Sequence, residues 1–276
     1  MIYQRIPPCP ALQDFVKEYM LCHFIADPAC PPVIQPLPPL PEHGLEFIPK
    51  GLATSINQQT GERSKETRYV IFGQPVSRIN FIMPDEEYLV IRVIFQPGGL
   101  FRLLGGVPLN EFTDKIADAE QILEPDIRFV NDQLLHAKSY SQLIKIIEEF
   151  LWNKIRRVKL ETHAVDKIGQ LLQGTPTRFS LDWLADQACL SPRQLERKFI
   201  ERLGIGPKLF SRISRFHQAF MHKEMHPQLD WFTVAVNYGY TDFQHLSKDV
   251  NQFAGVAPNT LLSEYARSPA KILQLA

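Results

Sequence analysis

The C-terminal part of the chain contains one segment twice, at a period of about fifty residues. The first copy, Ser180–Pro207, reads SLDWLADQACLSPRQLERKFIERLGIGP, and the second, Asp230–Pro258, reads DWFTVAVNYGYTDFQHLSKDVNQFAGVAP. Repetition of an apolar skeleton predicts two copies of one small helical unit. The matched positions are Ala185 and Ala235, Ser191 and Thr241, Leu195 and Leu246, Phe199 and Val250, Gly204 and Gly255, and Pro207 and Pro258.

Each copy has the start and stop signals of two short helices joined by a tight turn. The pattern predicts first helices over residues 181–188 and 231–237. Ser191 is the expected N-cap of the second helix in the first copy, with Pro192 at the first helical position and Gln194 completing a capping box. Thr241 with Gln244 is expected to repeat this device in the second copy. The predicted unit is a helix-turn-helix.

The second helix of the first copy has two distinct faces. Leu195, Phe199 and Leu203 lie four residues apart, so they share one face and are expected to pack inward. An arginine on the outward face can donate two hydrogen bonds to a guanine, which is worth about 1 to 3 kcal/mol in discrimination between bases. The outward stripe carries Arg193, Glu196, Arg197 and Ile200.

One continuous helix is predicted between the copies, from Pro207 to about Met225. Roughly 18 residues at 1.5 Å each give a length of about 27 Å. Such a strut could hold two reading helices near the roughly 34 Å that separate successive turns of a duplex.

The chain is neutral overall, but its charge is unevenly distributed. Residues 1–177 hold 18 Lys and Arg against 21 Asp and Glu, whereas residues 178–276 hold 12 against 9. This asymmetry favours a polyanionic partner for the C-terminal part. Residues 193–223 are the most basic stretch, with Arg193, Arg197, Lys198, Arg202, Lys208, Arg212, Arg215 and Lys223 against Glu196 and Glu201.

The N-terminal part has the composition of a β-rich domain. Proline-rich stretches at 7–10 and 29–44 exclude helix there. Strands are predicted at 45–49, 69–73, 78–83 and 88–96, and helices at 127–135, 141–158 and 161–173. The expected fold class is α+β: a β-rich N-terminal domain with a helical connector over 1–160, a linker helix and linker over 161–177, and an all-α double helix-turn-helix domain over 178–276.

The C-terminal part resembles the DNA-binding domain of the AraC/XylS family of transcription regulators over about residues 178–266. LADQACLSPRQLERKF, LGIGP and GYTDFQHLSKDVNQFAGVAP carry the resemblance. It implies double-stranded DNA as partner, read in the major groove by the second helix of each unit. The implied DNA-binding residues are Ser191, Arg193, Gln194, Glu196, Arg197, Lys198 and Ile200 in the first unit, and Thr241, Phe243, Gln244, His245, Ser247 and Lys248 in the second.

The second copy departs from the family pattern in its charges. Where family members usually carry arginine it has Lys248, which lacks the planar guanidinium fork. Asp249 follows, and no other basic residue lies between Asp230 and Glu264. We therefore expect the first copy to supply most of the DNA affinity.

The N-terminal part resembles, through the segment GQPVSRINFIMPDEEYLVIRVIFQPGGLFRLLGGVPLNEFTD, sensory domains that precede this module in some family members. The predicted function is a sequence-specific regulator controlled by a small molecule or a protein partner at this domain, without catalysis, cofactor or metal. The chain is expected to be cytoplasmic, with no membrane association. A homodimer through residues 141–158 is also considered, because that helix has a broad apolar face.

Two other classes stay open. A regulator of the DNA-repair methyltransferase type would need a reactive or zinc-bound thiol among Cys9, Cys22 and Cys30, but no CxxC spacing is present. His222 and His226 could share a helix face as metal ligands, although Lys223 stands where a zincin motif needs Glu. The other class is a ligand-binding protein with a degenerate DNA-binding half.

Overall fold

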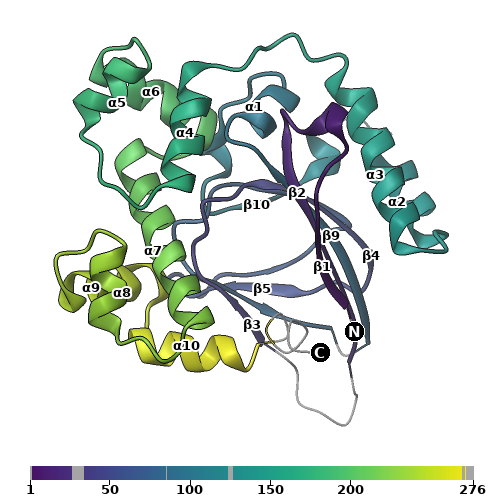
Figure 1. Cartoon of the computed structure of the whole chain (residues 1–276). Coiled ribbons are helices and arrows are strands. Elements are labelled where there is room, and N and C mark those ends of the chain that lie inside the picture. Colours follow the sequence, from purple (N-terminus) through teal and green to yellow (C-terminus); the bar gives the residue numbers. More distant parts are fainter. Residues whose placement is uncertain (1, 27–33, 85, 124–126, 269–270, 272–276) are drawn as a thin grey trace.

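The computed structural model describes residues 2–26, 34–84, 86–123, 127–268 and 271. A strand-rich N-terminal domain of antiparallel sheets is followed by a helical C-terminal domain (Figure 1), so the predicted α+β class is confirmed. No helix within these residues is long and apolar enough to cross a membrane.

The larger sheet has six antiparallel strands in the order β1-β2-β9-β4-β7-β10. Both of its faces are covered, and β9 explains how: Leu89, Ile91 and Val93 point to one face, whereas Val90 and Arg92 point to the other. The predicted run at 88–96 therefore reads as continuously apolar because it is buried on both sides. The strands are β1 (Ile2–Ile6), β2 (Val16–Ile25), β9 (Glu87–Phe95), β4 (Gly44–Lys50), β7 (Tyr69–Phe72) and β10 (Ile116–Asp118).

A smaller four-stranded sheet, in the order β3-β8-β5-β6, faces the inner side of the larger one. Phe81 of this sheet packs with Phe24, Tyr88 and Val90 of the larger sheet, so the two sheets share an interior. Its strands are β3 (Ile34–Leu37), β8 (Ile79–Ile82), β5 (Thr54–Asn57) and β6 (Arg63–Lys65).

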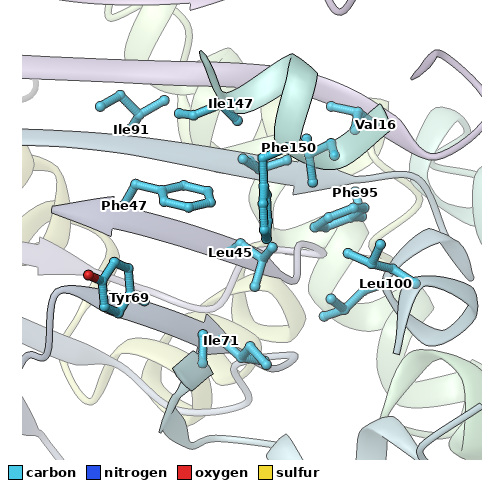
Figure 2. Packing of buried hydrophobic residues seen from close by; sticks show 14 of the residues in the cluster. Val16, Leu45, Phe47, Tyr69, Ile71, Ile91, Phe95, Leu100, Ile147 and Phe150 are labelled. Carbon is cyan, nitrogen blue, oxygen red and sulfur yellow. The ribbon is translucent and has the colours of Figure 1, made fainter. Parts of the chain in front are cut away.

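Helices cover the outer face of the larger sheet. Figure 2 shows Phe150 pointing from α3 (Tyr140–Ile155) toward the strand that carries Leu45 and Phe47. The Phe150 and Phe47 rings pack edge to face, with their centroids 5.9 Å apart. α1 (Gly99–Leu103) and α2 (Ile127–Leu135) complete this layer. The apolar face of α3 that suggested a dimer is therefore core, and the homodimer itself stays a prediction without that support.

The C-terminal domain is built around the long helix α7 (Pro207–Met225), which matches its predicted bounds. α4 (Ala164–Gly174) packs into the same apolar core through Val165, Ile168 and Leu172. The first unit is α5 (Leu181–Gln187) and α6 (Pro192–Leu203), the second is α8 (Trp231–Asn237) and α9 (Phe243–Ala254), and α10 (Pro258–Ala266) follows.

Candidate functional site

The turns of the two helix-turn-helix units have the same geometry. Cys189 adopts a left-handed conformation with φ of 53°, and Gly239, fifty residues later, adopts one with φ of 72°. The next amide bonds back across each turn, Leu190 N–H to the Ala185 carbonyl at 3.0 Å and Tyr240 N–H to the Ala235 carbonyl at 2.9 Å. This is a Schellman closure, which sets the angle between the helices in both units.

The predicted capping box at the start of α6 is present. The Ser191 hydroxyl accepts from the Gln194 amide at 3.3 Å, and the Gln194 side chain accepts from the Ser191 amide at 3.0 Å. Both side chains are exposed, but their polar atoms hold the first turn together. The backbone that carries Arg193 is therefore held in place, because it lies in the capped first turn.

The predicted cap of the second unit was wrong. Asp242, not Thr241, caps α9, and its carboxylate accepts from the His245 amide at 2.8 Å. Thr241 is exposed, with its hydroxyl near the His245 ring at 3.2 Å. A carboxylate accepts helix amides more strongly than a hydroxyl does, and its charge also suits the positive end of the helix dipole. The second copy is one residue longer than the first, and this extra residue consequently lies between the turn and the cap.

The corrected cap gives the start of α9 the same 51-residue correspondence to α6 that Leu195 and Leu246 have. Gln244 now takes the place of Arg193, and Lys248 the place of Arg197; all four side chains are exposed. Ser247 corresponds to Glu196 and Asn251 to Ile200. Asn251, which the sequence interpretation did not include, is exposed at this outer position, and its amide donates to the Ser247 carbonyl at 2.8 Å. Phe243 is exposed at the start of α9.

Other predicted site residues are partly buried or already engaged. Lys198 pairs with Glu201 at 3.0 Å and occupies the position of buried Asp249, off the outward stripe. His245 is half-buried against Tyr240, and Ser247 is half-buried under Asn251. Burial first, and then the nearby charge of Arg178, lowers the pKa of His245, so its imidazole is neutral at physiological pH.

The basic stretch over residues 193–223 is less exposed than its composition suggested. Arg202, Arg215 and Lys223 are buried, and Arg212 is tied to Asp249 at 2.6 Å. Three of the eight basic side chains in this stretch are therefore buried, and a fourth is paired with a carboxylate.

Asp249 has a structural role that corrects its interpretation as a repulsive charge. Its side chain is buried, and its carboxylate lies 2.6 Å from Arg212 and 3.4 Å from Arg215. The Tyr240 hydroxyl donates to the same group at 3.1 Å. The negative charge thus faces two guanidinium groups under α9 rather than the solvent.

The second unit also gains a cation that sequence reasoning missed. Arg178 precedes the first unit in the chain, yet its guanidinium lies 3.2 Å from His245 near the start of α9, and the side chain is exposed. The fold brings it there across sixty-seven positions, so no local pattern could indicate it.

A buried clamp fastens α6 and α4 to the β-rich domain. Arg202 makes two bonds to Asp166, at 2.7 and 2.6 Å, and stacks on Phe101 of α1 at 4.5 Å. A Cβ atom on Gly98 would lie 2.1 Å from the Asp166 carboxylate, so only glycine fits beside this pair. The Thr113 hydroxyl donates to the Gly204 carbonyl at 2.7 Å and fixes the end of α6.

A cavity of about 140 Å³ lies between the two sheets and reaches the helical domain. Phe24, Phe81 and Val90 line its β side, whereas His217 and Phe220 line it from α7. Its walls therefore come from both domains.

The three described thiols do not lie in a cluster of metal ligands. Burial raises the pKa of Cys22 to about 11, so this thiol is protonated and unreactive. Cys9 is partly buried and Cys189 is exposed, while Cys30 lies outside the described residues. Across the ranges that the structure describes, no three His, Cys, Asp or Glu side chains, including those of His222 and His226, gather closely enough to hold a metal ion.

Two family models match the chain. A helix-turn-helix domain matches residues 184–264, which span both units, and a domain of unknown function, DUF6597, matches residues 4–118. The C-terminal domain is thus a helix-turn-helix domain of the AraC type. The protein is a DNA-binding transcription regulator whose C-terminal domain carries the two units.

Two structures of ToxT from Vibrio cholerae are similar to this chain. A 1.65 Å structure is 13% identical, with 89% of this chain and 97% of that chain covered and a TM-score of 0.50. A structure with bound unsaturated fatty acid is also 13% identical, with 88% and 94% covered and a TM-score of 0.51. At such identity the likeness shows a shared fold. No protein of curated description matches the sequence.

Proposed function

We propose that this regulator binds specific DNA sequences through the outward faces of α6 and α9 and that a small molecule in the interdomain cavity controls this binding. Arginines and amides at the start of a capped helix are suited to base edges in the major groove. The proposed base-reading residues are Arg193, Glu196, Arg197 and Ile200 on α6, and Phe243, Gln244, Ser247, Lys248 and Asn251 on α9.

One observation carries the proposal: Arg193 and Arg197 on α6, and Gln244 and Lys248 on α9, are all exposed. These four side chains occupy equivalent positions on two capped helices whose turns close in the same way. α7 joins the two units, which lie toward its opposite ends (Figure 1). Two reading helices at the ends of one rigid strut can meet successive turns of the same duplex.

The remaining predicted residues are proposed to position the helices and to contact the DNA backbone. Ser191 and Gln194 cap α6, while Lys198 sits beside its outward stripe. Thr241 and His245 lie at the start of α9, next to Arg178. Contacts of this kind fix the register on the duplex without reading its sequence.

Control through the cavity is supported by the position of its walls. His217 and Phe220 belong to α7, the helix that joins the two units, so a bound molecule would touch the element that sets their separation. The ToxT structure with bound unsaturated fatty acid is a precedent for a small molecule in this fold. We also propose the domain division 1–160, 161–177 and 178–276.

A genome-wide pull-down of bound DNA tests the DNA-binding proposal. The wild type is expected to enrich a small set of related sites, and an Arg193→Ala, Arg197→Ala variant is expected to lose that enrichment. An Arg63→Ala, Lys65→Ala variant is the matched control, because it removes two exposed positive charges from β6. Equal enrichment by both variants would show that α6 does not select the sites.

A further inference from the structure

The cavity between the sheets contains three buried acids. Glu42, Glu46 and Glu66 are 7%, 6% and 5% exposed, and all three line the same space. Burial of an ionised carboxylate costs free energy unless a positive charge or hydrogen-bond donors pair with it, so we expect a partner for each of these groups. Glu46 has one, because Arg92 lies 2.6 Å from it.

The other two acids lack such a partner. The Glu42 side chain has no hydrogen bond or ion pair with any of the residues that the structure describes. Glu66 uses only one oxygen: its Oε2 accepts from the Ala53 amide at 2.9 Å and from the Tyr88 hydroxyl at 3.3 Å. Within the described ranges nothing bonds to its Oε1.

The positive groups of the cavity are already engaged. Arg92 is paired with Glu46 and lies over the Phe72 ring at 4.4 Å. Arg5 lies 2.9 Å from Glu18. Burial lowers the pKa of His217 to about 4, so this imidazole carries no charge at neutral pH. An entering anion would meet unpaired acids and occupied arginines.

The cavity is also rich in aromatic rings, whose faces attract cations. An apolar body is accommodated by methionine and aliphatic side chains between these rings. A cavity of about 150 Å³ holds a benzene ring, so the space here suits a molecule of about one ring. The rings are those of Tyr3, Phe24, Phe81, Tyr88, Phe220 and Tyr265.

We propose that the cavity binds a small organic cation, a protonated amine on an apolar body of about one aromatic ring, with Glu42 and Glu66 as its counter-charges. This inference rests on the proposed effector role of the cavity and names the class of molecule. The cation is organic rather than a bare metal ion, because the acids of the described residues do not converge on one point.

The protonation states agree with this assignment. Burial alone would raise the pKa of Glu42, but the charges of Lys17 and Arg92 outweigh it and hold that pKa below its ordinary value. Glu42 is thus ionised before the ligand arrives. Burial, and then the charge of Glu46, raises the pKa of Glu66 to about 8. An ammonium beside Glu66 favours its ionised form, so binding releases a proton.

Calorimetry of the full chain with three probes tests the proposal. 2-Phenylethylamine, 2-phenylethanol and 3-phenylpropanoate share an apolar body but differ in charge. The amine is expected to bind at least tenfold more tightly than either of the others. Glu42→Gln and Glu66→Gln are each expected to weaken amine binding tenfold or more and to leave alcohol binding within twofold. Glu62→Gln, a change at an exposed acid, is the control.

Three results would overturn the cation assignment: tighter binding of the carboxylate, no binding of the amine, or unchanged amine affinity in both cavity variants. Unchanged circular dichroism and alcohol binding would establish that the variants are folded. DNA binding of the same proteins is measured without any amine. If the protein binds specific DNA but does not bind the amine, only this inference is rejected. If it binds the amine but no specific DNA, the regulator function is rejected.

Discussion

Cys189 and Gly239 occupy the same left-handed position in the two turns, but only glycine adopts it without steric cost. The first unit tolerates the strain because Cys189 is exposed and the turn is closed by backbone hydrogen bonds. The residue type at this one position therefore separates two otherwise equivalent turns.

Cys189→Gly is expected to stabilise the protein slightly, by about 0.5 kcal/mol, because relief of the left-handed strain exceeds the entropy that glycine loses on folding. Gly239→Ala is expected to cost about 1 kcal/mol, since its Cβ would also approach the Pro176 carbonyl at 3.2 Å. Urea unfolding measures both, with Cys189→Ala as the control for loss of the thiol. A destabilised Cys189→Gly variant would contradict the argument.

Glu66 makes the stability depend on pH. Because its pKa is raised from 4.5 to about 8, the folded protein keeps a proton that the unfolded chain has released, and stability falls as pH rises across that interval. Burial lowers the pKa of His43 and of His217 from 6.5 to about 4. Through these two groups stability rises with pH between about 4 and 6.5, and their contribution is constant above pH 6.5. The interval from 6.5 to 8 therefore excludes the contribution of these two histidines.

In ligand-free protein the free energy of unfolding is expected to fall by at most about 2 kcal/mol between pH 6.5 and 8. The groups that face Glu66 are Glu46, Tyr88 and Arg92; burial raises the pKa of Glu46 and of the Tyr88 hydroxyl as well. Urea unfolding of Glu66→Gln should give a flat profile there, and Glu62→Gln should follow the wild type. A flat wild-type profile would contradict the raised pKa.

Among the elements, α6 and α9 differ in what stands at equivalent positions. Arg197 on α6 can make two parallel bonds to a base, whereas Lys248 on α9 offers a single ammonium. Asp249 does not weaken α9 electrostatically, because it is neutralised below the helix, and Arg178 adds a charge at its start. The second unit is thus less acidic at its surface than its sequence indicates.

Arg197→Ala is expected to weaken binding to the selected DNA site by about 1 to 3 kcal/mol, and Lys248→Ala by less than 1 kcal/mol, because the planar guanidinium fork fits a guanine edge better than a flexible ammonium does. Fluorescence anisotropy at several salt concentrations measures both. Equal losses would mean that the two reading helices share the affinity.

Asp249→Asn is expected to destabilise the protein by about 3 kcal/mol, since Arg215 would be left buried without a counter-charge. Tighter DNA binding is not expected, although the change removes a negative charge from α9. Thermal or urea unfolding and anisotropy on the same protein separate the two effects. Unchanged stability with tighter DNA binding would restore the interpretation of Asp249 as a repulsive surface charge.

Helices were predicted more completely than strands, for a local reason. α2, α7 and α8 have their predicted bounds, because their apolar spacing lies within the helix itself. β2 was missed, since its alternation is interrupted by a register shift between Val16 and Glu18. β5 and β6 are short and polar, and they exist through pairing with distant strands. Arg178 and the cavity depend on similarly distant contacts.

At the scale of the whole molecule, the clamp around Asp166 and Arg202 joins the first unit to the β-rich domain. It combines a buried ion pair, a stacked Phe101 ring and the close approach of Gly98. The second unit reaches the β-rich domain elsewhere, through Arg78 and Glu264 of α10.

Gly98→Ala is expected to cost at least about 2 kcal/mol more than Gly105→Ala. Both glycines have positive φ, at 78° and 68°, but a Cβ at Gly105 meets nothing within 4 Å, whereas one at Gly98 meets the Asp166 carboxylate. The difference thus measures the clamp without the backbone term. Urea unfolding gives both values. Equal costs would mean that the Asp166 side chain can move away from the new Cβ atom without loss of stability.

The two attachments give the reading helices different freedoms. α6 is fastened to the β-rich domain by the buried ion pair, whereas α9 meets that domain only through an exposed hydrogen bond from Gln59 to the Gln252 carbonyl at 3.4 Å among the described contacts. α9 also packs on α7, which forms one wall of the cavity. If an occupant displaces α7, the second helix rotates about the duplex axis relative to the first. Since one base pair advances the duplex by about a tenth of a turn, we expect liganded and free protein to prefer operators whose half-sites differ in spacing by a base pair or so.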